Sequence, residues 1–226
     1  MTKDNPAALA ETPAPSTRTR DPERTRQDIL NAAADEFAKY GLSGARVDAI
    51  AARTSTTKRM IYYYFESKEG LYTAVLERAY AGIREIESGM KLDKLDPETA
   101  LRRLVEFNFD YHDAHPEFVR LVMIENIHNG AHIKDAPDLR RTNSPAIEVL
   151  SDILQRGYKA GVFKRQIEPR ELHMMISALS FYRVSNRATF GTLFSIDFGA
   201  PQTRERHRRH ICLLYTSPSP RDRTRS

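Results

Sequence analysis

The stretch Thr56–Leu71, which reads TTKRMIYYYFESKEGL, constrains the fold more than any other part of the chain. Its first half predicts a short helix over 57–65. Ser67 is a good N-cap for a second helix, and Glu69 lies in the first turn, where the helix dipole favours a carboxylate. Three consecutive tyrosines and a phenylalanine cannot all be buried, because neighbouring side chains on a helix point about 100° apart. Some of these rings must therefore face solvent or a partner.

Two further helices are predicted before this stretch. The first covers 22–40, with Asp21 as its N-cap and Gly41 as the residue that ends it. The second is short, covers 47–53, and is joined by a three-residue turn to the helix over 57–65. Two short helices joined by such a turn, with the second exposed and basic, form a helix-turn-helix, which binds DNA through its second helix.

The helix over 57–65 is expected to have an inward and an outward face. Met60, Ile61 and Tyr64 can pack inward. The residues left for the outward face are Thr57, Lys58, Arg59, Tyr62 and Tyr63. Basic side chains beside tyrosines suit a phosphate backbone and the edges of bases, so this face is the candidate DNA-binding surface.

The run VDAIAARTSTTKRMIYYYFESKEGLYTAVL resembles the DNA-binding domain of the tetracycline-repressor (TetR) family of transcriptional regulators. Three parts of the family pattern are present: Ile-Ala at 50–51, Tyr-x-x-Phe at 62–65 and Ser-Lys-Glu-x-Leu at 67–71. The resemblance covers residues 24–80. One departure is the turn at 54–57, where the family's Ala-Gly-Val-Ser reads Thr-Ser-Thr-Thr. Ser55 replaces the glycine, which costs about 1 kcal/mol if its φ is positive.

This resemblance implies a homodimer that binds a palindromic double-stranded DNA operator. Lys68, at the start of a helix, would bind a phosphate, and a solvated lysine is the alternative. Thr57 and Tyr63 would contact the DNA backbone, and the other outward residues would lie in the major groove. The complete set of expected DNA-binding residues is Arg46, Thr56, Thr57, Lys58, Arg59, Tyr62, Tyr63 and Lys68.

The overall charge is a weaker indication of DNA binding than the isoelectric point suggests. The chain has a formal net charge of +5. Residues 201–226 contain seven arginines and two acids, which account for this whole excess. Residues 1–200 are therefore near neutral, and the case for nucleic acid depends on the local pattern at 56–71.

The chain is expected to have four parts. Residues 1–20 are rich in Ala, Pro and Thr and predict a disordered arm, which either stays solvated or touches DNA. Residues 21–66 form the helix-turn-helix domain. Residues 67–212 form a helical regulatory and dimerisation domain, whose first helix, over 67–90, connects it to the first domain. Residues 213–226, LLYTSPSPRDRTRS, resemble translated sequencing-adapter sequence rather than native protein and are left out of the fold argument.

The second domain is predicted to be helical throughout, with helices over 97–115, 116–129, 144–160 and 168–190 after the connecting helix. The fold class is therefore all-α, with an N-terminal three-helix helix-turn-helix domain plus a larger C-terminal helical ligand-binding and dimerisation domain. By resemblance, the last two of these helices would form the dimer interface, although a core within one chain would give the same pattern. The apolar stripe expected on the connecting helix is Leu71, Val75, Ala79, Ile83 and Ile86.

Polar residues among aromatic and apolar ones predict a small-molecule pocket in this domain, because such sites are mostly apolar with a few convergent polar groups. An ordinary core is the alternative for any one of these residues. The expected ligand-binding residues are Phe107, Asn108, Tyr111, His112, Met123, Asn126, Met174 and Phe181. Glu125 and His128 have the Glu-x-x-His spacing of di-iron bundles, but this single pair is too little for a site, so no metal is expected.

Several classes of protein find no support in the sequence. The single cysteine, Cys212, rules out a disulfide framework and a Cys-based zinc site. No apolar run approaches the about 20 residues needed to span a bilayer, and the N-terminus lacks the apolar region of a secretory signal. We therefore expect a cytoplasmic protein without a membrane partner. No phosphate loop, nucleophile elbow or redox motif is present, so neither catalytic residues nor a cofactor is expected.

The predicted function is that of a TetR-type transcriptional repressor, which an unknown small-molecule effector releases from its operator. The alternative is a DNA-binding regulator that has no small-molecule effector. An enzyme housed in the helical domain is a third hypothesis, and only the grouping of histidines with Glu125 supports it.

Overall fold

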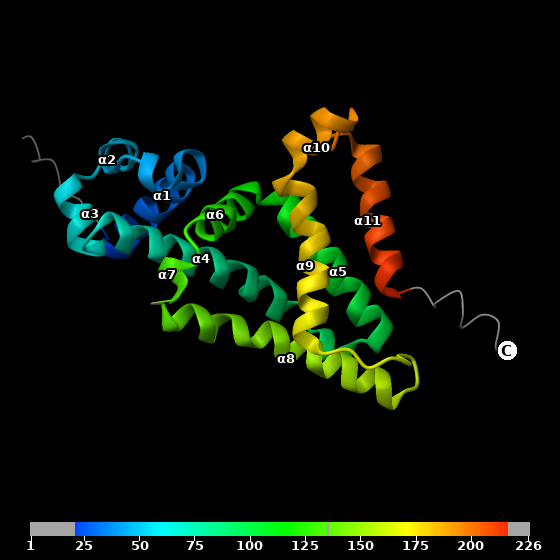
Figure 1. Ribbon diagram of the computed structural model, residues 1–226. Coiled ribbons are helices and arrows are strands. Elements are labelled where there is room, and N and C mark those ends of the chain that lie inside the picture. The colour runs from blue at the N-terminus through cyan, green and yellow to red at the C-terminus, as the bar shows by residue number, and fades with distance from the viewer. Residues whose placement is uncertain (1–20, 135, 217–226) are drawn as a thin grey trace, which may run out of the picture.

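The computed structural model describes residues 21–134 and 136–216, and within them it contains helices and no strands. The predicted all-α class is therefore confirmed. The predicted arm over 1–20 and most of the predicted tail lie outside the described residues. Figure 1 shows α1–α3 at one end of the molecule, with α4 leading from them into the helices of the C-terminal part.

The N-terminal part consists of α1 (Pro22–Gly44), α2 (Val47–Thr54), α3 (Lys58–Phe65) and α4 (Lys68–Gly89). A 3-10 turn, η1 (Leu92–Lys94), leads into the C-terminal part. That part consists of α5 (Pro97–Ala114), α6 (Pro116–Ile127), α7 (Ala131–Lys134), α8 (Pro137–Lys159), α9 (Pro169–Ser185), α10 (Arg187–Phe194) and α11 (Pro201–Thr216).

Side-chain caps fix where the N-terminal helices begin. Asp21, Thr57 and Ser67 each accept a hydrogen bond from a backbone N–H two or three residues later, at 3.0, 3.2 and 2.9 Å. Such a cap satisfies one of the backbone donors that the first turn of a helix leaves unpaired. Gly41 has a φ of 70°, so α1 is interrupted where its end was predicted, and a last turn then reaches Gly44.

Two predicted helix bounds are wrong. The helix expected over 144–160 begins at Pro137, and Pro145 lies inside it. A proline there removes one helical hydrogen bond, and burial of apolar residues on both sides of it, Leu139 and Ala146 among them, offsets this loss. The helix expected over 168–190 ends at Ser185, and α10 begins two residues later.

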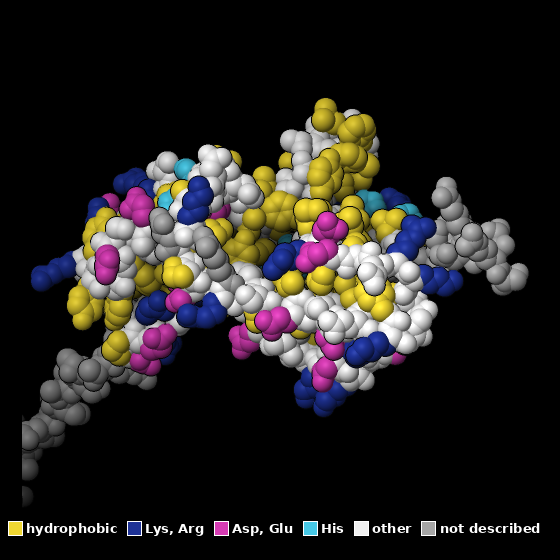
Figure 2. Space-filling view, turned by 60° about the horizontal axis from the view of Figure 1, so that its bottom comes forward, with side chains coloured by type: hydrophobic (Ala, Val, Ile, Leu, Met, Phe, Trp, Pro, Cys, Tyr) yellow, Lys and Arg dark blue, Asp and Glu magenta, His cyan; other side chains and the backbone are white. Residues whose placement is uncertain are grey.

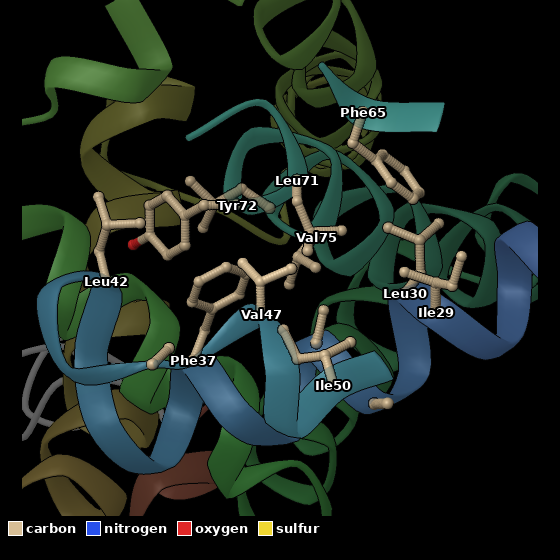
Figure 3. Close-up of a cluster of buried hydrophobic side chains, with 14 of the residues drawn as sticks. Ile29, Leu30, Phe37, Leu42, Val47, Ile50, Phe65, Leu71, Tyr72 and Val75 are labelled. Atoms are coloured by element: carbon tan, nitrogen blue, oxygen red, sulfur yellow. The ribbon is translucent and has the colours of Figure 1, made fainter. Parts of the chain in front are cut away.

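One apolar core joins the helix-turn-helix to the rest of the molecule. Phe37, Ile50, Ile61 and Tyr72 are fully buried within it, one from each of α1 to α4. Figure 3 shows the rings of Phe37 and Tyr72 close to each other between α1 and α4, and their centroids lie 5.2 Å apart in an edge-to-face arrangement. The same core includes Leu121 of α6, so α1 packs directly against the C-terminal part.

A second core holds α5, α8, α9 and α11 together. Leu104 and Phe109 of α5 pack there with Leu150 and Ile153 of α8 and Ile176 of α9. The apolar stripe predicted as a dimer surface on 144–160 is thus used within one chain. This is what the alternative, an intrachain core, predicts, and the dimer interface stays a prediction.

The arginines of α11 are paired with acids of α5. Arg204 contacts Asp113 at 2.7 Å and Asp110 at 2.6 Å, and Arg208 contacts Asp110 at 3.2 Å. Burial alone would raise the pKa of Asp113, but hydrogen bonds from Arg183 and Arg204 hold it below its usual value. Part of the positive charge near the C-terminus therefore serves the packing of α11 rather than a nucleic-acid surface.

The junction of α3 and α4 has no room for a side chain at Gly70. A Cβ added there would lie 2.2 Å from the carbonyl oxygen of Phe65. We expect Gly70→Ala to lower the free energy of unfolding by about 2 kcal/mol, because two rigid helix ends would have to move apart. Urea denaturation followed by circular dichroism measures the change.

The matched control is Gly89→Ala, at the other end of α4, where an added Cβ meets nothing within 4 Å. This variant should be at least as stable as the original chain, because alanine favours a helix over glycine by about 1 kcal/mol. Equal stability of the two variants would contradict the close contact between Gly70 and Phe65.

Candidate nucleic-acid interface

Helix α3 has one buried stripe, and its other side is exposed. Ile61 and Phe65, four residues apart, are buried, and Tyr64 is half-buried beside them. Tyr63 is 77% exposed. The expected DNA-binding residues on this helix, Lys58, Arg59, Tyr62 and Tyr63, all have exposed side chains. Figure 2 shows basic side chains projecting from the end of the molecule that carries α3.

Met60 was predicted to pack inward, and this prediction is wrong, because its side chain is 37% exposed. It precedes Ile61 by one residue, so its side chain points about 100° away from that of Ile61. A sulfur-bearing apolar side chain is therefore added to the exposed face of α3.

The turn between α2 and α3 has a left-handed residue at Ser55, the position where the family pattern has a glycine. Ser55 has φ 51° and ψ 32°, in the left-handed region, and its N–H bonds to the carbonyl of Ala51. The expected cost of about 1 kcal/mol for a serine in this conformation therefore applies. Thr57 follows as the cap of α3, and Thr56 between them is half-buried.

Helix α2 places an acid next to the basic pair of α3. Lys58 Nζ lies 3.3 Å from an oxygen of Asp48, and both side chains are about half exposed. Arg46, just before α2, is exposed, while its backbone N–H donates to the buried carboxylate of Glu36 at 3.1 Å. The acid Glu36 thus fixes the start of α2, and Asp48 reduces the positive charge at the start of α3.

Lys68 occupies the first position of α4, where the helix dipole disfavours a cation. Its Nζ donates to the carbonyl of Ser43 at 3.2 Å, which ties α4 to the last turn of α1. An ammonium group has three donors, so this bond leaves others for a further acceptor. A lysine at this position has both a structural contact and the capacity to bind an anion.

The expected ligand-binding residues fall into two groups. Asn108 and His112 are buried, and Phe107, Tyr111 and Phe181 are half-buried. The ring of His112 stacks on Phe118 at a centroid distance of 5.8 Å and meets Phe181 edge-on at 6.1 Å. The structure therefore brings together residues of α5, α6 and α9.

The second group of expected ligand-binding residues points away from this place. Met123 is 36% exposed and Met174 is 62% exposed. Asn126 is also exposed, and its amide donates to the carbonyl of Val122 in its own helix. Met123 and Met174 lie on the exposed sides of their helices, which sequence spacing alone did not fix because α6 and α9 are apolar on more than one side.

Sequence reasoning missed a polar cluster between α4, α5 and α9. We define the polar cluster as Arg84, Glu87, His112 and His173. The side chains of Arg84 and Glu87 form an ion pair and are only 12% and 3% exposed. Burial raises the pKa of the Glu87 carboxyl, although Arg84 opposes this shift, and it lowers the pKa of His112 to about 4. Burial also lowers the pKa of His173.

The polar cluster was not predicted because the apolar stripe of the connecting helix was assigned to the wrong residue at its end. Ile86 was assigned to the buried side of α4 but is 50% exposed, whereas Glu87 is buried. The spacing that runs through Val75, Ala79 and Ile83 reaches 87 at the next step of four. The signal that could have revealed the cluster was therefore a carboxylate, that of Glu87, at the next position of an apolar stripe.

Glu125 has a structural role that differs from metal binding. Its carboxylate accepts the backbone N–H groups of His132 and Ile133, at 2.8 and 3.2 Å, and so caps α7. It also contacts the ring nitrogen Nδ1 of His132 at 3.0 Å. Among the described residues, no group of three or more His, Cys, Asp or Glu side chains is placed to hold a metal ion. None of the helices that the structure describes is long and apolar enough to cross a bilayer.

Comparisons with known proteins agree with this arrangement of helices. Residues 29–75 match the family model described as bacterial regulatory proteins, tetR family. Residues 97–214 match the model of the tetracyclin repressor-like C-terminal domain. A solved structure of the transcriptional regulator SCO4942 from Streptomyces coelicolor superimposes with a TM-score of 0.63 at 27% identity, over 86% of this chain and 99% of that one.

Two relatives are named as transcriptional repressors. The chain is 39% identical to the HTH-type transcriptional repressor NicS of Pseudomonas putida, over 83% of this chain and 88% of that protein. It is 32% identical to the HTH-type transcriptional repressor SCO4008 of Streptomyces coelicolor, over 73% and 81% of the two chains. With both family models matched in order and these two relatives, the chain belongs to the TetR family of bacterial transcriptional regulators.

Proposed function

We propose that this protein is a repressor that binds a palindromic operator as a homodimer and leaves it when a small-molecule effector binds. The observation that carries the proposal is the orientation of α3. The cationic and aromatic side chains of this short helix are exposed, while its apolar residues Ile61 and Phe65 are buried in the core. In this proposal, residues 21–66 are the DNA-binding domain and 67–212 are the regulatory and dimerisation domain.

The DNA-binding step would use the exposed face of α3. Lys58, Arg59 and Tyr62 would enter the major groove, where arginine and lysine recognise guanine edges. Thr57, Tyr63 and Lys68 would contact the phosphates on either side, with the N-terminus of α4 adding its dipole. The remaining proposed contacts are Arg46, just before α2, and Thr56, in the turn between α2 and α3.

The homodimer would form through α9 and α10. These helices present large apolar side chains to solvent, an arrangement that marks a protein interface when the residues lie together. The residues are Met174, Met175, Leu179, Tyr182, Leu193 and Phe194, each at least 40% exposed. Two copies joined there would present two α3 helices, and such symmetry requires an operator with two related half-sites.

The effector would act through the contacts between the two domains. Helix α4 belongs to both, and α1 packs on α6. A ligand that separates helices near His112 would therefore change the position of α1–α3 relative to a dimer partner. Because an effector shifts an equilibrium only through its differential affinity, it must fit the form that is released from DNA better than the bound form.

Asp48 gives a test of which face meets DNA. Asp48→Asn removes the carboxylate beside Lys58 and frees its ammonium group. We expect affinity for a random-sequence duplex to rise several-fold at low salt, and the slope of log K against log salt to steepen by about 0.9, the value of one phosphate contact. Fluorescence anisotropy over a sodium chloride series measures both quantities.

The control for this experiment is Asp138→Asn, which makes the same change of charge at the start of α8 in the other domain. It should leave the slope unchanged. A similar effect of both variants would mean that total charge, rather than the neighbourhood of Lys58, sets the affinity.

Lys68 gives a test of the phosphate contact. A duplex selected from a random library with the purified protein should be palindromic, and Lys68→Ala should weaken binding to it at every salt concentration and reduce the salt slope by about 1. Lys159→Ala, the same change at the end of α8, is the control. If Lys68→Ala binds as tightly as the original chain, its bond to Ser43 is its whole role.

Leu179 gives a test of the dimer. Leu179→Glu puts a charge in the middle of the exposed apolar surface of α9, and we expect it to shift the molar mass in light scattering from two chains to one. Ile127→Glu is the control, because Ile127 is a 75% exposed apolar side chain at the end of α6, on neither of the proposed interface helices. A Leu179→Glu protein that keeps the mass of two chains would place the interface elsewhere.

A further inference from the structure

The ion pair between Asp48 and Lys58 lies at the end of the molecule that carries the candidate DNA-binding surface. Asp48 is the second residue of α2, and Lys58 is the first residue of α3. Lys58 Nζ lies 3.3 Å from each of the two carboxylate oxygens of Asp48. The pair therefore holds a hydrogen-bond donor and an acceptor next to each other, at the N-terminal end of the helix that a helix-turn-helix places in the major groove.

This pair does not suit a surface that only has to attract phosphates. A carboxylate repels the DNA backbone and opposes the charge of Lys58, and the helix dipole disfavours a cation at the first position of α3. Stability does not explain the pair either, because exposed ion pairs contribute little and the side chains of Lys58 and Asp48 are 49% and 60% exposed. Recognition of bases is the use that both members of the pair can serve.

Base pairs differ in the order in which donors and acceptors appear in the major groove. Guanine and thymine present a keto oxygen, which accepts, whereas cytosine and adenine present an amino group, which donates. The ammonium group of Lys58 only donates, and the carboxylate of Asp48 only accepts. Held side by side, the two groups fit a base pair in one orientation, with its keto base beside Lys58 and its amino base beside Asp48.

The two base pairs that fit in this orientation are not equivalent. Guanine offers a second acceptor, N7, next to its O6, and thymine has a methyl group instead. The ammonium group of Lys58 has three donors, of which Asp48 uses part, so it can also reach both guanine acceptors. The expected order is G·C first and T·A second. The two reversed pairs come last, because they bring a keto oxygen toward the carboxylate of Asp48.

We propose that Asp48 and Lys58 together read one G·C base pair in each half-site of the operator. Lys58 donates to O6 and N7 of the guanine, and Asp48 accepts from the N4 amino group of the paired cytosine. Asp48 is thus a specificity-determining residue, although it was not among the expected DNA-binding residues. This inference rests on the proposed function, since it names the base pair that α2 and α3 select.

The test measures base preference position by position. A palindromic duplex is selected from a random library with the purified full chain, and all four base pairs are then placed symmetrically at each half-site position. Fluorescence anisotropy gives the affinity for each duplex. We expect one position at which T·A binds several-fold more weakly than G·C, and both reversed pairs roughly tenfold or more weakly, the usual effect of a mismatched base pair. The lack of any position with this order would overturn the proposal.

Two variants separate the contributions of the pair. Asp48→Asn replaces the carboxylate by an amide, which both donates and accepts, so the reversed base pairs should bind nearly as well as G·C at that position alone. Lys58→Ala should lose the preference for G·C over T·A but still reject the reversed pairs, because Asp48 remains. If Asp48→Asn keeps the wild-type order at every position, Asp48 does not read bases and the proposal is wrong.

The matched control is Asp35→Asn in α1. Asp35 pairs with Arg53 of α2 at 2.5 Å, and these two side chains are 60% and 48% exposed, as in the pair of Asp48 with Lys58. The control removes the same charge from the same domain and should leave the order of base pairs unchanged at every position. A loss of preference in Asp35→Asn equal to that in Asp48→Asn would assign the effect to total charge and refute the readout.

Folding and the proposed function are checked on the same samples. Both aspartates are exposed, so thermal unfolding followed by circular dichroism should be nearly unchanged in the two variants. Wild type that selects no palindromic duplex refutes the proposed function and this inference with it. Wild type that selects one, but shows no position with the expected order, refutes only the readout by Asp48 and Lys58.

Discussion

Burial of the Tyr72 side chain is the interaction on which the coupling of the two parts of the molecule depends. Tyr72 is fully buried on α4, with its ring against Phe37 of α1 and, at 5.0 Å, against His132 of α7. Its hydroxyl donates to the carbonyl of Leu121 on α6 at 3.4 Å. Burial, helped by the negative charge of Glu125, raises the pKa of this hydroxyl, so it stays neutral and can remain in the core. One ring thus joins α1, α4, α6 and α7.

From this junction, α4 extends to the polar cluster. Arg84 is twelve residues beyond Tyr72, which corresponds to about 18 Å along a helix. A rigid helix anchored at Tyr72 and carrying Arg84 and Glu87 near its other end is a physical link between the C-terminal part and α3, whose end abuts α4 at Gly70.

Electrostatics in this chain is local. The net charge of +5 suggests a basic surface, yet arginines of α11 are paired with Asp110 and Asp113 of α5, and the basic start of α3 has Asp48 beside it. Exposed pairs of this kind contribute little to stability, whereas the partly buried group around Asp113 holds α11 against α5. The few unopposed charges near α3, rather than the isoelectric point, make the case for DNA.

Sequence alone determined what depends on neighbouring residues: the caps at Asp21, Thr57 and Ser67, the left-handed Ser55, and the exposed tyrosines that a single helix cannot bury. Tertiary structure decided which face of each later helix is buried. Ile86 and Glu87 are neighbours on α4, and only the packing of α4 against the C-terminal helices, chiefly α8, decides that the carboxylate, not the isoleucine, points inward. The same holds for Met123, Asn126 and Met174, because a helix that is apolar on several sides does not encode in its own sequence which side meets a partner.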